Sequence, residues 1–185
     1  MLSLGQIERR ARQLLIDHQI NEPSVDVHSL AMALGAVIKE EASDSDVSGA
    51  LFREKDQVII GVNSSHSQYR KRFTVAHELG HFLLHDDVVR IDHHYMEVAQ
   101  KPGMRPIANR SQISSEAKDP REIEANRFAA ALLMPADFLE RDLRERRLPL
   151  SDKEIAQLAK TYEVSVQAMS FRLINLGIPV DVAGK

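Results

Sequence analysis

Hydrophobic residues near the start of the chain recur every three or four positions, as they do on one face of a helix. The residues from Ile7 to Leu15 follow this spacing, which predicts an amphipathic helix over about residues 4–19. A second helix is predicted over residues 27–34, because Asp26 before it is a suitable N-terminal cap and the glycine after it is a suitable terminator.

Three short apolar runs follow, at residues 36–38, 49–52 and 58–63. They are rich in β-branched and aliphatic residues, and polar segments at residues 43–48 and 53–57 separate them. This pattern predicts strands joined by turns. We expect a small antiparallel or mixed sheet, with antiparallel pairing as the simplest arrangement.

The rest of the chain has the pattern of helices around one long polar segment. Residues 90–118 contain Pro102-Gly103 and Pro106, which predicts an irregular loop, either a lid over a site or a disordered segment. Capping patterns begin further helices at Asp119-Pro120 and at Ser151. The predicted helices cover residues 67–85, about 120–134, 135–147, and two in a tail that ends near Leu176-Gly177.

These elements predict a compact α+β domain over residues 1–148. The tail, residues 149–185, has the spacing of apolar residues that is typical of a helix-turn-helix, and it is expected to pack on the same domain.

The composition restricts the chemistry available to the protein. None of the 185 residues is a cysteine, so a metal ion must be held by histidine and carboxylate groups. Cysteine absence fits a cytoplasmic location, and neither a signal peptide nor an apolar stretch of membrane-spanning length is recognisable. The formal net charge of −3 gives no general reason to expect a nucleic-acid-binding protein. Oligomeric state is left open.

The candidate chemistry lies in the helix that carries His77-Glu78-Leu79-Gly80-His81. Two histidines four residues apart lie on one helical face, where both side chains reach one metal ion. Glu78 lies beside them and is suited to act on a water molecule as a general base. The apolar residues of the helix project from the opposite side, and the small Gly80 leaves room for a close approach. The alternative is a solvated face of histidine and glutamate without a metal.

His85 lies on the same side one turn later. It is about 6 Å further along the helix axis, too far to join the same ion, so we expect it to support the ligands or to face solvent.

A catalytic zinc site needs a third protein ligand, and the helix that begins at Pro120 offers two glutamates. Glu122 falls in an apolar, inward-facing stripe, where a carboxylate is costly unless it is paired or bound to metal. Glu124 projects to the other side and is predicted to be solvated. Asn126 is placed to hydrogen-bond a ligand histidine. Alternatively, Glu122 only completes a helix cap with Asp119.

Two longer motifs then resemble a known family. The run Arg70–His85, RKRFTVAHELGHFLLH, and the run Glu122–Pro135, EIEANRFAAALLMP, resemble the motifs of the ImmA/IrrE metallo-endopeptidases. The resemblance implies a zincin-like fold with Zn²⁺ on His77, His81 and Glu122. It also implies a protein substrate, typically a helix-turn-helix repressor or antitoxin of the XRE type.

The mechanism that we expect is zinc-assisted hydrolysis of a peptide bond, with Glu78 as general base and then general acid. Tyr95, His93, His94 and Tyr69 are alternative donors to the tetrahedral oxyanion, and the sequence does not choose among them. The strand over residues 58–62 is a candidate for pairing with an extended substrate, unless it is an ordinary core strand.

Direct DNA binding is the weaker interpretation of the tail. Its second helix carries a single basic residue, Arg172, whereas neutralising DNA phosphates needs several. Four arginines between Arg141 and Arg147 alternate with acidic residues, which is typical of a solvated helix face. The alternatives to an endopeptidase are a non-catalytic regulator that binds a transcription factor or DNA with a structural metal site, and an exopeptidase acting on short peptides.

Overall fold

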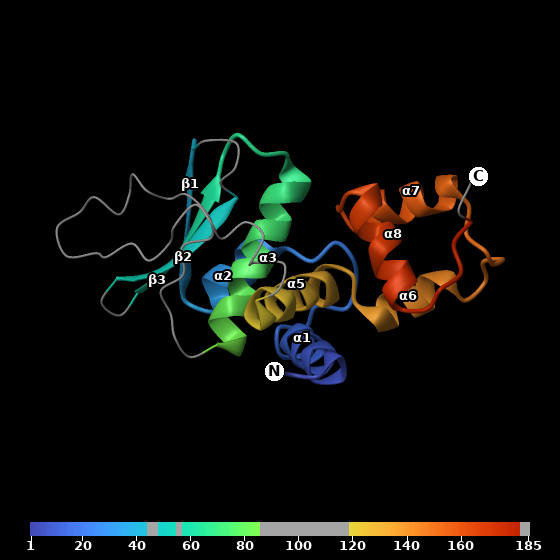
Figure 1. Cartoon of the computed structure of the whole chain (residues 1–185), viewed down its shortest axis with the longest axis horizontal. Helices are drawn as coiled ribbons and strands as arrows, with labels where there is room; N and C mark the ends of the chain where they lie inside the picture. The colour runs from blue at the N-terminus through green and yellow to red at the C-terminus, as the bar shows by residue number, and fades with distance from the viewer. Residues whose placement is uncertain (44–47, 55–56, 86–118, 182–185) are drawn as a thin grey trace. The chain divides into compact units, whose positions relative to one another are not determined.

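The computed structural model describes residues 1–43, 48–54, 57–85 and 119–181 (Figure 1). Within these ranges the chain forms seven α-helices and one three-stranded sheet, which confirms the α+β class. The expected loop over residues 90–118 lies outside the described residues. The elements in chain order are α1 (Leu4–Asp17), α2 (Val27–Ala33), β1 (Ala36–Glu41), β2 (Gly49–Glu54), β3 (Gln57–Asn63), α3 (Gln68–Leu84), α5 (Pro120–Leu133), α6 (Ala136–Leu143), α7 (Asp152–Thr161) and α8 (Val166–Asn175).

The chain divides into two compact units. The first comprises Met1–Leu2 and Asp26–Ala129, and it contains the sheet, α2, α3 and the first turns of α5. The second comprises Ser3–Val25 and Ala130–Lys185, so it combines α1 with the last helices. The boundary that the sequence predicts at residue 148 stays a prediction.

The sheet has the order β1-β3-β2, with β3 in the centre. β2 pairs with β3 antiparallel, but β1 pairs with β3 parallel, with Ala36 opposite Val58. Of the two arrangements that the sequence allowed, the sheet is therefore the mixed one. The simpler expectation, antiparallel pairing throughout, was wrong. The apolar run of β3 suits its central place, because its residues from Val58 to Asn63 are all buried. β1 ends in exposed charged residues, as an edge strand does.

Since β3 has a strand on each side, it offers no free edge to a substrate. The hypothesis that residues 58–62 pair with an extended peptide is wrong for that strand. In the described sheet, β2 is one of the two edge strands.

Helix α3 follows β3 after a short turn and contacts α2, β2 and β3. Ser67 caps it, accepting a hydrogen bond of 3.3 Å from the backbone N–H of Arg70. Val75, Ala76 and Leu79 are fully buried, as the sequence predicts. The opposite face is buried as well, so the candidate catalytic residues lie inside the unit and not on a solvated face.

The second unit buries one face of α1 through Ile7, Ala11 and Leu15. Arg172 of α8 is also buried there, and its guanidinium donates two hydrogen bonds to the carboxylate of Glu8, of 2.5 and 2.9 Å. A third hydrogen bond, from its Nε, reaches the backbone oxygen of Met134. The basic residue of α8 is thus committed to internal contacts, which argues against a role in binding DNA phosphates.

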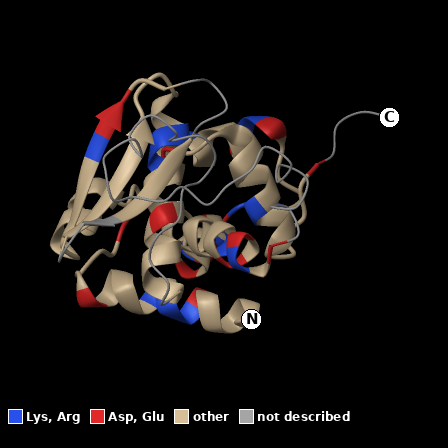
Figure 2. Ribbon diagram, turned by 60° about the vertical axis from the view of Figure 1, so that its left-hand side comes forward, with Lys and Arg blue, Asp and Glu red and all other residues tan. Residues whose placement is uncertain are grey.

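Acidic and basic positions both occur along the helices of the described segments (Figure 2). Arg141 illustrates this, because its guanidinium lies 3.7 Å from Asp142 and stacks over the ring of Phe138. No helix within the described ranges is long and apolar enough to cross a lipid bilayer.

Candidate metal centre

The two motif histidines of α3 point to the same place. Their Nε2 atoms lie 3.0 Å apart, and both residues are buried. The i, i+4 spacing puts both imidazoles on one helical face, one turn apart. Because α3 is packed on several sides, that face is enclosed by protein.

Helix α5 supplies the third group. The two carboxylate oxygens of Glu122 each lie 3.2 Å from a histidine nitrogen, Oε2 from His77 Nε2 and Oε1 from His81 Nε2. One ligand atom from each of the three residues lies within 4.8 Å of the others. Two imidazole nitrogens and one carboxylate oxygen are the donor set of many catalytic zinc sites, which keep a fourth position for water. The residues present therefore fit a metal ion of this kind.

Glu122 has the ionisation state that a metal ligand requires. Burial alone would raise its pKa, but hydrogen bonds with His77 and His81 outweigh burial and hold the pKa far below its ordinary value. The position of both Glu122 oxygens beside the histidine nitrogens agrees with the ligand interpretation, which stays a prediction. Asp119 accepts a hydrogen bond from the backbone N–H of Arg121 at 2.9 Å.

Glu78 is fully buried and follows His77 directly on α3. Its Oε1 lies next to Gly49 of β2, where a Cβ atom would be 3.4 Å away. The same Cβ would lie 2.2 Å from Thr74 Cγ2, so only glycine allows β2 to come this close to α3. The candidate base thus lies between the histidine pair and an edge strand.

Each histidine has a hydrogen-bond partner at its second ring nitrogen. His77 Nδ1 lies 3.1 Å from Asn126 Oδ1, which is the contact that the sequence predicts for Asn126. With Nε2 directed at the metal centre, Nδ1 carries the proton and donates it to the amide oxygen. This contact fixes the tautomer and orientation of the His77 ring.

On the other side, His81 Nδ1 lies 3.1 Å from His85 Nδ1. His85 Nε2 in turn lies 3.0 Å from Glu124 Oε2. Glu124 is only 4% exposed, so the prediction that it is solvated was wrong. Its other oxygen accepts a hydrogen bond from the backbone N–H of Leu2. Burial favours a raised pKa for Glu124, but the hydrogen bonds from His85 and Leu2 lower the pKa below its ordinary value.

The close packing of α3 on α5 explains why Glu124 is buried. A Cβ atom on Gly80 would lie 3.0 Å from Ala125 Cα and 3.2 Å from the Ala125 oxygen, so the two backbones nearly touch at this point. At such a crossing, residues on both flanks of α5 face α3: Glu122 contacts His77 and His81, and Glu124 contacts His85 one turn later.

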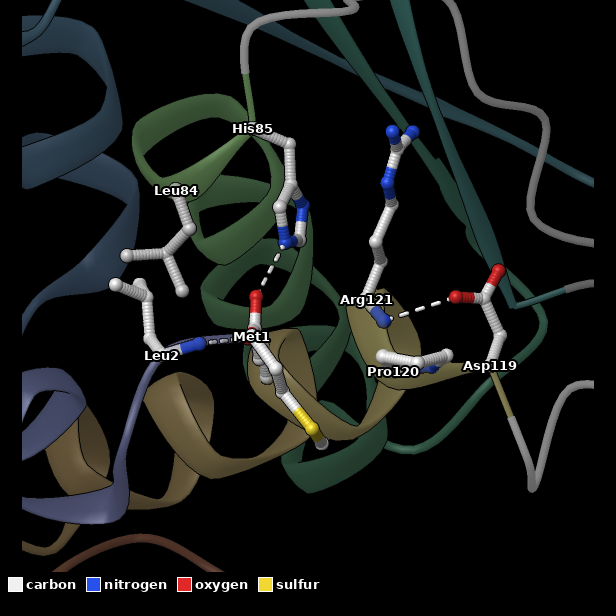
Figure 3. Close-up of a pocket in the computed structure, with 8 residues that line it drawn as sticks. Met1, Leu2, Leu84, His85, Asp119, Pro120 and Arg121 are labelled. Atoms are coloured by element: carbon white, nitrogen blue, oxygen red, sulfur yellow. Dashed lines mark hydrogen bonds and ion pairs between the residues drawn. The ribbon is translucent and has the colours of Figure 1, made fainter.

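A pocket of about 410 Å³ lies beside the pair formed by His85 and Glu124 (Figure 3). In Figure 3 a dashed line runs from the His85 ring to the carboxylate of Glu124. The backbone N–H of Leu2 donates to the other oxygen of that carboxylate. The pocket extends to Asp119 and Arg121.

Of the four candidate oxyanion donors, Tyr95, His93 and His94 lie outside the described residues. Tyr69 is 44% exposed in the first turn of α3. It precedes His77 by eight residues, about 12 Å along the helix axis. Its position gives no support for the role.

Comparison with known proteins agrees with the site. The sequence model of the IrrE N-terminal-like domain, a peptidase family, matches residues 31–174. The radiation response metalloprotease IrrE of Deinococcus deserti is 29% identical over 178 residues, covering 96% of this chain and 57% of that protein. The protein of the same name from Deinococcus radiodurans is 29% identical over 172 residues, covering 92% of this chain and 47% of that protein. The chain thus spans about half the length of these relatives.

Among solved structures, a Mycobacterium tuberculosis transcriptional regulator is similar in fold. The TM-score is 0.58 at 16% identity, and the match covers 91% of this chain and 46% of that chain. At this identity the likeness concerns the fold alone.

Proposed function

Since the chain belongs to the IrrE N-terminal-like peptidase family, we propose that it is a zinc-dependent endopeptidase that hydrolyses a peptide bond in a protein substrate. One observation carries the proposal. Three ligand atoms from His77, His81 and Glu122 converge within 4.8 Å, directly beside a buried glutamate. Two imidazoles, a carboxylate and a separate base are what a zincin-like hydrolase uses.

His77, His81 and Glu122 would hold the zinc ion and leave a coordination position open. A zinc ion held there would supply Lewis acidity for activating a water molecule and the substrate carbonyl. Glu78 accepts the proton of the attacking water and delivers it to the nitrogen of the leaving amine. Asn126 keeps His77 in the tautomer whose Nε2 is unprotonated and suited to bind metal.

The substrate is proposed to bind as an added strand on β2. That strand lies at the edge of the sheet, and its Gly49 adjoins Glu78. An extended peptide paired with β2 would form main-chain hydrogen bonds and run alongside the candidate base. A flexible segment or linker of a folded protein fits this requirement better than a helix does.

The proposed substrate class is a helix-turn-helix repressor or antitoxin. The resemblance to the ImmA/IrrE family supports this class, and the relatives from Deinococcus are named for a radiation response.

The test is to incubate the purified, zinc-loaded chain with helix-turn-helix proteins encoded beside it and to identify fragments by mass spectrometry. We expect one defined cut, which a chelator abolishes and added zinc restores. Glu78→Gln should lower the cleavage rate by about 10²- to 10⁴-fold, because it removes the general base. It should keep zinc, whereas Glu122→Gln should lose it.

Other outcomes separate the alternatives. Normal turnover by Glu78→Gln would show that the assigned base is wrong. Tight binding of a repressor without any fragment would favour a non-catalytic regulator. Rapid cleavage of short unrelated peptides from one end would favour an exopeptidase.

A further inference from the structure

His85 and Glu124 form a buried pair at the edge of the metal centre. Their side chains are 8% and 6% exposed, and their Nε2 and Oε2 atoms lie 3.0 Å apart. The pair is not isolated, because the other nitrogen of His85 lies 3.1 Å from His81 Nδ1. A continuous line of polar contacts therefore runs from Glu124 through His85 to a candidate metal ligand.

The direction of the hydrogen bonds follows from the ligand geometry. His81 Nε2 is the atom that converges with His77 and Glu122, so His81 carries its proton on Nδ1. That N–H donates to His85 Nδ1, which must then be the unprotonated nitrogen of its ring. His85 consequently carries its own proton on Nε2 and donates it to the carboxylate of Glu124. With this arrangement of protons, each contact from His81 through His85 to Glu124 has one donor and one acceptor.

The two ligand histidines are thus supported unequally. His77 donates to the neutral amide oxygen of Asn126, whereas His81 donates to an imidazole that is itself polarised by a carboxylate. A carboxylate behind a ligand histidine orients the ring and makes the ligand nitrogen more basic. Here the carboxylate acts through a second imidazole.

We propose that Glu124 and His85 are positioning residues for the metal ion: Glu124 fixes the tautomer of His85, and His85 fixes and polarises His81. The inference rests on the proposed metal site but does not depend on any substrate. A plain alternative is that the pair only joins α3 to α5, as a buried structural contact.

The test measures zinc affinity by chelator competition and, separately, unfolding of the metal-free protein. Glu124→Gln keeps the size of the side chain and removes its charge. His85→Phe keeps a ring and removes both nitrogens. We expect each variant to weaken zinc binding by about 10- to 100-fold, the usual effect of removing such a partner.

A double-mutant cycle tests whether Glu124 acts through His85. If it does, adding Glu124→Gln to His85→Phe should weaken zinc binding little beyond His85→Phe alone. Strictly additive losses of zinc-binding free energy would overturn the proposal that Glu124 acts through His85. Visible absorption of the cobalt-substituted proteins gives an independent readout, since a reoriented His81 should change the ligand-field bands.

Glu40→Gln is the matched control. Glu40 of β1 pairs with Lys71 of α3 at 2.8 Å. Lys71 is in the same helix as His81 but lies ten residues before it. Its loss should leave zinc affinity unchanged. Should Glu124→Gln and His85→Phe reduce the stability of the metal-free protein yet bind zinc as tightly as the wild type, the pair is only structural.

The result of this affinity test can be told apart from the result of the cleavage test of the proposed function. A wild-type chain that binds zinc but cleaves no candidate substrate contradicts the endopeptidase proposal and leaves this inference to be judged by the affinities. A wild-type chain that binds no zinc contradicts both.

Discussion

Gly80 sets the distance between α3 and α5. A methyl group there would lie 3.0 Å from Ala125 Cα, and backbone atoms cannot move aside as a flexible side chain can. The change Gly80→Ala gains up to about 1 kcal/mol in helix propensity but costs about 1–3 kcal/mol in overpacking. We therefore expect a net loss of stability and weaker zinc binding, because α5 carries Glu122. Denaturant unfolding and zinc titration measure the two effects.

Gly5→Ala is the control for this prediction. The nearest atom to a new methyl group at Gly5 is the flexible end of Arg9, 3.7 Å away, so nothing has to shift. This variant should be neutral or more stable by a few tenths of a kcal/mol up to about 1 kcal/mol. Equal destabilisation of both variants would contradict the role assigned to Gly80.

Spacing within each helix was enough to group His77 with His81 and Glu122 with Asn126. In the structure the two groups lie together, since Glu122 contacts both histidines and Asn126 contacts His77. Glu124 was placed in solvent because a projection assumes one buried face. The close crossing at Gly80 buries two flanks of α5, and this contact involves residues more than 40 positions apart.

Helix ends were also predictable, because their capping groups are local in sequence. Asp26 caps α2 as expected, and its carboxylate accepts hydrogen bonds from the backbone N–H groups of His28 and Ser29. The strand order of the sheet was not predictable in the same way. Periodicity identifies β1, β2 and β3 separately, but which strand lies in the centre depends on how the connections cross.

The cap of α2 gives a prediction with a defined pH dependence. The pKa of Asp26 is lowered, chiefly by hydrogen bonds from the side chain and backbone of Ser29. A lowered folded-state pKa stabilises the fold above the ordinary aspartate pKa of about 4, and this contribution is lost as the pH falls through the folded-state value. Asp26→Ala should cost about 1 kcal/mol at pH 7 and progressively less below about pH 4.

Unfolding in denaturant at several pH values measures this difference. Asp26→Asn serves as the comparison, because asparagine keeps the cap but does not titrate. It should retain most of the stability at pH 7 and lack the acid-dependent part. A constant difference between wild type and Asp26→Ala down to pH 2 would show that the carboxylate charge contributes nothing.

In the molecule as a whole, the second unit is assembled from distant parts of the sequence. The hydrogen bonds between Arg172 and Glu8 join residues 164 positions apart. Hydrophobic patterns locate α1 and α8 but do not show that they share a unit, so the sequence alone did not predict this pairing. A buried charge pair with a long sequence separation is established only when the chain is folded.

Arg172→Met tests how much this pair contributes. It removes three hydrogen bonds and leaves Glu8, whose side chain is 24% exposed, without its cation. Removing one partner of a buried pair costs about 3–5 kcal/mol, and we expect the lower end of that range because Glu8 retains some solvent contact. Denaturant unfolding monitored by circular dichroism measures the loss.

Arg12→Met is the matched control in the same unit. Arg12 also joins α1 to a later helix, through Asp137 at 2.8 Å, but both side chains are more than a third exposed. An exposed pair contributes about 0–1 kcal/mol. A loss from Arg172→Met no larger than that from Arg12→Met would mean that burial adds nothing to this ion pair.

The separation of Glu8 from Arg172 also bears on how the protein is made. At translation rates of about 5–20 residues per second, α1 leaves the ribosome roughly 10–30 s before α8 does. Until α8 is made, α1 lacks part of the unit in which Ile7, Ala11 and Leu15 are buried. The newly made helix therefore exposes apolar surface of the kind that nascent-chain chaperones bind, whereas β3 and α3 follow one another directly along the chain.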